Sequence, residues 1–201
     1  MAAPAPPLPP VPLWSAQRYR LRQKVLSLGR KYYLEDDAGN LLGYCEAALF
    51  KLREELRVYA DEAKNQELLV LKQAQLLDAT GRFEVRDAPT GQLVGSLARK
   101  FWRSWVRDEW VLLDAQGAEL ARLKEESMVA AVLTRLPGVG LFVPKRMLLF
   151  LSDGAVAADF QRQLWSLGTW SLSLTDPTRI PDRRLLVAGL ILMEAVEQQQ
   201  E

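Results

Sequence analysis

The 201-residue sequence contains no histidine and a single cysteine, and it has no apolar run of the roughly 20 residues needed to cross a bilayer. Without histidine, no Ser-His-Asp triad, Cys-His pair or His-ligated zinc site can form. Cys45 alone can form neither an intramolecular disulfide nor a cysteine zinc cluster, and it suits a reducing compartment. We therefore predict a protein that is not an enzyme, needs no cofactor or metal, and has no transmembrane span.

The overall composition shows little bias toward any class of partner. Lys plus Arg number 26 and Asp plus Glu number 25, so net charge favours neither nucleic acid nor a membrane surface. At 49% hydrophobic residues, the length suits one globular domain. The first residues lack the basic and apolar regions of a secretory signal. The expected location is the cytoplasm, with peripheral association at a membrane left open.

Proline dominates the beginning of the chain, which reads MAAPAPPLPPVPL. Prolines remove backbone donors and favour an extended polyproline II conformation. We predict a disordered proline-rich tail over residues 1–14 and a folded domain over residues 15–201. The PxxP spacing of Pro7, Pro9, Pro10 and Pro12 fits a ligand for an SH3 or WW domain, and a passive spacer is the alternative.

A unit of strand, Asp- or Gly-containing turn and returning strand occurs five times after the tail. The units cover residues 31–45, 56–72, 82–99, 110–124 and 147–162. Asp and Gly favour hairpin turns because Gly accepts positive φ and Asp bonds to nearby backbone. An opening strand near Arg18 and a last strand at 169–174 bring the total to twelve. We predict a mainly β fold in which twelve antiparallel strands close into a barrel, since closure removes exposed edges.

The segment from Leu185 to Met193 carries no charge and no hydrogen-bonding side chain, so a helix here must be enclosed on every side. We predict a central helix over about 182–197, beginning at Pro181 and Asp182, that fills the barrel. Its expected core residues are Leu186, Leu190, Ile191 and Met193. A second, short helix is predicted within 125–144 from helical spacing of apolar residues.

From Trp14 to Val196, the chain resembles the tubby C-terminal-like superfamily, in its branch of phospholipid scramblases and LURP-one-related proteins. The resemblance rests on the repeated strand, turn and strand, as in 33–43 and 110–123, and on the terminal apolar helix. It implies a twelve-stranded barrel around a central helix. The superfamily includes phosphoinositide-binding proteins and calcium-dependent lipid scramblases. Here Asp176 and Asp182 lie among three arginines, which makes a poor calcium site.

Two basic clusters are candidates for binding an anion or a lipid. The first is the outer face of the opening strand and the second is a basic, aromatic connector. Their residues are Arg18, Arg20, Arg22 and Lys24, followed by Arg99, Lys100, Trp102, Arg103, Trp105 and Arg107. Cations attract lipid phosphates and tryptophans favour the headgroup boundary. Alternatives are a solvated face for the first cluster, and core packing or single-stranded nucleic acid for the second, with nucleic acid least favoured.

These observations predict a non-enzymatic binding or scaffold protein of the LURP-one-related, scramblase-like family. Its partners would be anionic phospholipid headgroups on the basic face and a protein bound to the proline-rich tail. The alternative function is phospholipid scrambling. The sequence does not decide whether the two basic clusters form one surface.

Overall fold

A computed structural model describes residues 11–24, 29–47, 55–74, 81–100, 109–126, 145–163 and 169–197, without the side chains of Ala47, Lys100, Val196 and Glu197. The elements are α1 Pro12–Ser15, β1 Arg18–Gln23, β2 Lys31–Glu35, β3 Leu41–Ala47, β4 Glu55–Tyr59, β5 Glu67–Gln73, β6 Arg82–Asp87, β7 Leu93–Lys100, β8 Glu109–Asp114, β9 Glu119–Glu125, β10 Arg146–Leu151, β11 Val156–Arg162, β12 Thr169–Leu174 and α3 Arg183–Glu197. The helix predicted within 125–144 falls almost entirely outside the described residues.

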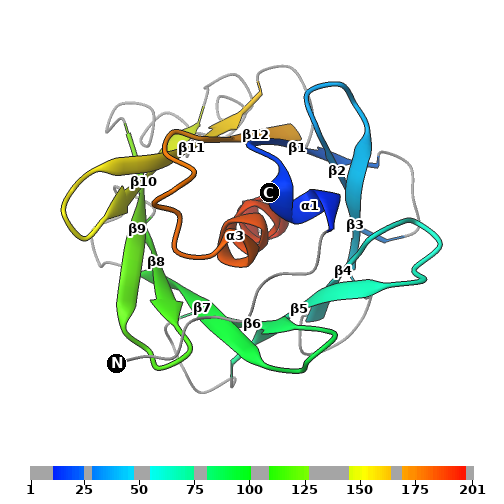
Figure 1. The fold of residues 1–201 in the computed structure, drawn as a ribbon, viewed down its shortest axis with the longest axis horizontal. Coiled ribbons are helices and arrows are strands. Elements are labelled where there is room, and N and C mark those ends of the chain that lie inside the picture. The colour runs from blue at the N-terminus through cyan, green and yellow to red at the C-terminus, as the bar shows by residue number, and fades with distance from the viewer. Residues whose placement is uncertain are drawn as a thin grey trace.

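The twelve strands form one closed antiparallel barrel, in which each strand pairs with its neighbours in sequence and β1 pairs with β12 (Figure 1). Closure rests on the register that sets Leu21 opposite Trp170 and Tyr19 opposite Leu172. The prediction of a mainly β, closed, twelve-stranded barrel followed by a C-terminal helix is therefore confirmed.

The pairs β2–β3, β4–β5, β6–β7, β8–β9 and β10–β11 share a local feature. In each pair the register shifts just before the turn, through a bulge or other irregularity, for example between Leu34 and Glu35. Four of the five turns begin with an aspartate that accepts backbone N–H groups, as Asp36 accepts those of Ala38 and Asn40 at 2.9 and 2.8 Å. Gly39 then adopts a φ of +83°, a conformation that glycine tolerates without strain. We call this end of the barrel the hairpin end.

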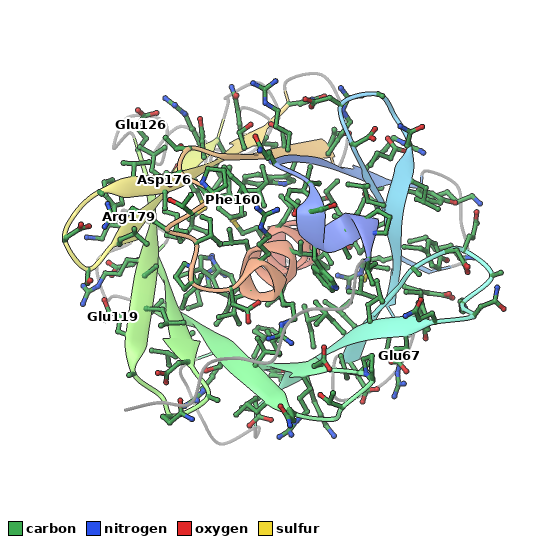
Figure 2. The ribbon with its side chains drawn as sticks, viewed as in Figure 1. Glu67, Glu119, Glu126, Phe160, Asp176 and Arg179 are labelled. Carbon is green, nitrogen blue, oxygen red and sulfur yellow. The ribbon has the colours of Figure 1, made fainter. Side chains whose placement is uncertain are left out.

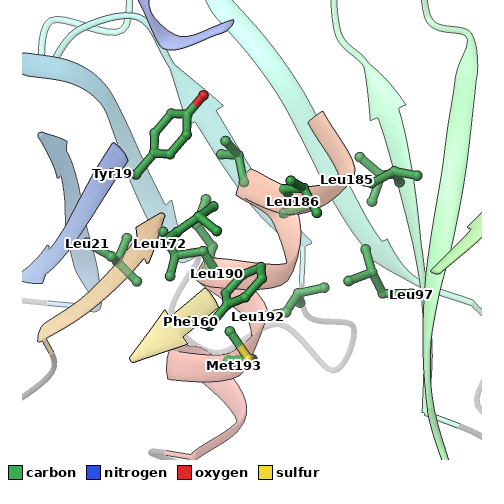
Figure 3. Close-up of a cluster of buried hydrophobic side chains, with 14 of the residues drawn as sticks. Tyr19, Leu21, Leu97, Phe160, Leu172, Leu185, Leu186, Leu190, Leu192 and Met193 are labelled. Carbon is green, nitrogen blue, oxygen red and sulfur yellow. The ribbon is translucent and has the colours of Figure 1, made fainter. Parts of the chain in front are cut away.

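Helix α3 lies inside the ring of strands in Figure 1, and apolar side chains of the strands surround it in Figure 3. Leu186, Leu190, Ile191 and Met193 are 1, 0, 0 and 3% exposed. Asp182 caps the helix by accepting the backbone N–H of Arg184 at 2.9 Å. The helix thus begins next to Asp182, as the sequence predicted, and its second residue, Arg184, contacts Asp87 at the hairpin end.

The beginning of the chain differs from the prediction. The sequence predicted a disordered tail as far as residue 14, but Leu13 and Trp14 are buried and belong to the core. They lie in α1, a single helical turn with Pro12 near its start. Their apolar burial outweighs the extended preference of the prolines before them, so the packed part of the chain includes Val11 to Ser15.

Candidate functional site

The first basic cluster occupies the outer face of β1. Along this strand, exposed Arg18, Arg20 and Arg22 alternate with buried Tyr19 and Leu21. The alternation follows from the two-residue period of a strand whose other face packs into the barrel. Lys24 follows directly after the strand and is also exposed.

Carboxylates on neighbouring segments contact most of these cations. Arg22 binds Glu35 on β2 through its Nη2, at 2.7 Å from Oε1, and its guanidinium lies 4.8 Å from the centre of the Tyr33 ring. Arg18 pairs with Asp37 at 3.3 Å, and both side chains are about two-thirds exposed, 67 and 69%. Exposed ion pairs of this kind contribute little to stability, about 0–1 kcal/mol, so an external anion can compete for Arg18.

Lys24 belongs to a small network on the same face. Its Nζ lies 3.3 Å from an oxygen of Glu62, and the Tyr33 hydroxyl donates to that oxygen at 2.9 Å. The hydrogen bond from Tyr33, together with Lys24, lowers the pKa of Glu62. Glu62 is therefore ionised near neutral pH and neutralises part of the charge of Lys24.

Arg20 is the exception in this cluster. It is exposed, and it forms no ion pair in the part of the chain that the structure describes. In the register it lies opposite Ser171 on β12, while Arg18 lies opposite Ser173. The Ser171 hydroxyl already donates to the carbonyl of Gln161 at 3.3 Å, so the donors that this face offers to phosphate oxygens are the guanidinium groups.

Three arginines on the outer faces of other strands contact two carboxylates each. Arg57 contacts Glu55 and Glu67, and Arg122 contacts Glu109 and Glu119. Figure 2 shows Glu67 and Glu119 on the outside of the ring.

The same arrangement occurs on β10. Arg146 meets both Glu126 and Asp159 at 2.8 Å. Each of Arg57, Arg122 and Arg146 is thus matched by two carboxylates, whereas Arg18 and Arg22 each meet one. The β1 face is therefore less neutralised than the surroundings of these three arginines.

The second basic cluster is only partly described, and its first residue is not on the surface. Arg99 is 8% exposed, and its guanidinium lies 5.9 Å from the Trp110 ring centre. Since Arg99 alternates with buried Gly95 and Leu97 along β7, it lies on the inner face. Arg99, which the sequence proposed as a lipid or anion contact, is therefore buried inside the barrel and does not lie on its outer surface. The Lys100 side chain and all of Trp102, Arg103, Trp105 and Arg107 lie outside the described residues.

The topology also bears on whether the two clusters meet. In the ring, β1 and β7 are six strands apart in both directions, so they lie on opposite sides of the barrel (Figure 1). Outer side chains of the two strands consequently point in opposite directions. The outer faces of β1 and β7 therefore do not join into one cationic surface.

The two carboxylates next to the terminal helix are engaged within the chain. Asp176 accepts the hydroxyl and the backbone N–H of Thr178 at 2.6 and 3.1 Å. Asp182 binds the Arg184 guanidinium, with Nη2 2.7 Å from Oδ2. Across the described ranges, no group of three or more His, Cys, Asp or Glu side chains is placed to hold a metal ion.

Two carboxylates that neutralise the first basic cluster, Glu35 and Glu62, were not predicted from the sequence. Glu35 could have been recognised, because it lies on the outer face of the strand that follows β1 and the register sets it opposite Arg20. Glu62 could not have been recognised from the sequence, because it lies in a turn 38 residues beyond Lys24. Its approach depends on how the turn between β4 and β5 folds.

No protein-family model matches this chain, and no curated protein sequence matches it. In the described part of the chain, neither helix has the length and apolar character to cross a membrane.

Proposed function

We propose that this protein is a non-enzymatic binding or scaffold protein whose β1 face contacts anionic phospholipid headgroups. The contact residues would be Arg18, Arg20 and Arg22, with Lys24 at the end of the strand. In this proposal the protein acts in the cytoplasm and associates peripherally with a membrane surface. It requires no cofactor and carries out no chemistry on the lipid.

The observation that carries the proposal is the state of Arg20. Arg20 is exposed, forms no ion pair in the described residues and lies between two further arginines of β1, so its guanidinium offers donors to a phosphate group. Arg57, Arg122 and Arg146, by contrast, already meet two carboxylates each. A phosphate approaching β1 therefore displaces fewer internal contacts.

We also propose membership of the LURP-one-related, scramblase-like branch of the tubby-like fold. Support comes from the five strand pairs with a register shift at the same place and from the low exposure of α3 within the ring. In that family the barrel would be built from repeated hairpins around a buried central helix. Scrambling is not favoured by a specific observation, because Asp176 and Asp182 are engaged by the chain itself.

Co-sedimentation with vesicles tests the lipid proposal. We expect the protein to pellet with phosphatidylcholine vesicles containing phosphatidylserine or phosphoinositide and not with phosphatidylcholine alone. The double variant Arg18→Gln and Arg20→Gln should bind about 30-fold more weakly, because each basic residue near an anionic surface contributes about 1 kcal/mol.

A matched control removes two positive charges elsewhere, with Arg122→Gln and Arg146→Gln on β9 and β10. Each of these arginines already meets two carboxylates, so we expect binding close to that of the unchanged protein. Equal loss in both double variants would indicate a net-charge effect and refute a β1 site. Negligible binding to every vesicle would refute the lipid proposal itself.

A further inference from the structure

The turn that joins β4 to β5, residues 60–66, reaches across the outer face of the barrel to the first basic cluster. Its Glu62 carboxylate accepts the Tyr33 hydroxyl of β2 at 2.9 Å and lies 3.3 Å from Nζ of Lys24, directly after β1. In the ring, β3 and β2 separate β4 from β1. The turn therefore brings a carboxylate to β1 across two intervening strands.

A second side chain of the same turn fastens it to β3. Lys64 forms an ion pair with Glu46 of β3, and its Nζ lies 6.0 Å from the centre of the Tyr59 ring on β4. The turn is thus held by two residues of opposite charge, Lys64 at β3 and Glu62 at β2 and β1.

The backbone of Lys64 distinguishes this turn from the other hairpin turns. Lys64 has a φ of +62°, and among the described residues it is the only one other than glycine with a positive φ. The other four hairpin turns have a glycine at positive φ, namely Gly39, Gly91, Gly117 and Gly154. Residues other than glycine rarely adopt this conformation, and surrounding contacts must hold them in it. The ion pair with Glu46 is such a contact.

We infer that the β4–β5 turn is an autoinhibitory contact for the first basic cluster: Glu62 occupies the position at Lys24 that an anionic lipid headgroup takes, and headgroup binding releases the turn. The inference rests on the proposed lipid contact and adds its regulation. Lys24 and Glu62 are 43 and 51% exposed, and ion pairs this exposed are weak, so a headgroup phosphate can replace the carboxylate. The closed turn lowers the apparent affinity for lipid.

Co-sedimentation with phosphatidylcholine vesicles containing phosphatidylserine tests the competition. Glu62→Gln changes an exposed side chain without altering its size, and it should bind about fivefold more tightly, since one opposing charge near the anionic surface is removed. Glu119→Gln is the matched control, because Glu119 also pairs with a basic side chain, Arg122, but lies on β9, four strands from β1 in the ring. It should bind like the unchanged protein.

Two further variants separate autoinhibition from net charge. If Glu62 acts through Lys24, the gain from Glu62→Gln should disappear when Lys24→Gln is already present. Lys64→Gly restores the residue type of the other turns and removes the ion pair to β3. It should therefore bind more tightly than the unchanged protein, although loss of a positive charge alone predicts weaker binding.

Hydrogen exchange of the backbone amides reports release of the turn directly. Residues 60–66 should exchange faster when the unchanged protein binds phosphatidylserine vesicles, whereas the turn at residues 114–118 should not change. Unchanged exchange in residues 60–66, or equal gains in affinity from Glu62→Gln and Glu119→Gln, would overturn the autoinhibition and leave the lipid contact in place. Absence of vesicle binding in every variant would refute the lipid contact and the autoinhibition together.

Discussion

Arg184 at the start of α3 lies 3.2 Å from Asp87 at the end of β6, and the two side chains are 8 and 10% exposed. The same guanidinium binds Asp182, the capping residue of the helix, at 2.7 Å. Asp87 in turn accepts the Thr90 hydroxyl at 2.6 Å within the following turn. This cluster joins the terminal helix to the hairpin end of the barrel and accounts for the buried charges there.

Replacing Arg184 with Leu should destabilise the protein by about 3–5 kcal/mol, because it leaves two largely buried carboxylates without their cation. The free energy of unfolding from urea titrations measures this effect. Arg179→Leu is the control, since Arg179 pairs with Asp153 in an exposed position, and it should cost no more than about 1 kcal/mol. Equal costs in the two variants would contradict a structural role for the buried cluster.

The interior position of α3 predicts a large effect at Leu190, which is 0% exposed. Leu190→Ala should cost about 2–5 kcal/mol through the cavity that it leaves, and Leu190→Asp should abolish cooperative folding. Thermal unfolding followed by circular dichroism is the measurement. Leu41→Asp, at a position 42% exposed, should fold normally. A folded Leu190→Asp protein would contradict the central position of the helix.

Strands β7 and β8 approach closely at Gly95, so we expect a side chain at this position to destabilise the protein. A Cβ built there would lie 2.2 Å from the carbonyl oxygen of Leu113 and 3.2 Å from Leu185 Cδ1. Because backbone must move, Gly95→Ala should destabilise by at least about 1–3 kcal/mol. Gly43→Ala, whose nearest contacts would be 3.3 Å away, should cost less. Chemical denaturation measures the free energy of unfolding of both variants. A larger loss for Gly43→Ala than for Gly95→Ala would contradict the close approach at Gly95.

Stability should fall in acid because turn carboxylates have lowered pKa values. A hydrogen bond from Asn40 lowers the pKa of Asp36, one from the backbone of Ala155 lowers that of Asp153, and one from Thr178 lowers that of Asp176. A pKa lowered by folding adds stability above the unfolded value, near 4, and loses it as the pH falls through the folded value.

We therefore expect the urea midpoint to decrease from pH 6 to pH 3. Replacing Asp36, Asp153 and Asp176 together with Asn removes the three titrating groups while keeping a side-chain oxygen acceptor. The triple variant should show a smaller decrease over the same pH range. An unchanged pH dependence would show that these turns do not contribute to acid sensitivity.

The strands were predictable because their signals are local. The turn at Asp36–Asn40 and the alternation of Arg18 to Gln23 each require only the residues present in a short window. The last strand was predicted with the bounds that the structure has, Thr169–Leu174. The helix start at Asp182 was likewise visible, because a capping carboxylate acts on the next turn of backbone.

The candidate site was less predictable, because exposure and pairing depend on residues far apart in sequence. The basic character of the stretch beginning at Arg99 could be seen, but its inward orientation follows from the strand pairing that sets Arg99 opposite Trp110. The burial of Leu13 and Trp14 likewise depends on β3 and α3, which the proline-rich composition does not reveal.

The sequence by itself determined that this chain forms twelve short strands and a C-terminal helix with an apolar stretch at Leu185–Met193, since periodicity, turn residues and length are properties of neighbouring residues. Only the tertiary structure decided which basic side chains are exposed and which already pair with carboxylates. Closing the ring sends β1 and β7 to opposite sides, turns Arg99 inward and brings Glu62 to Lys24. Electrostatic interactions act through space, so the charge of the β1 face is set by partners that only folding assembles.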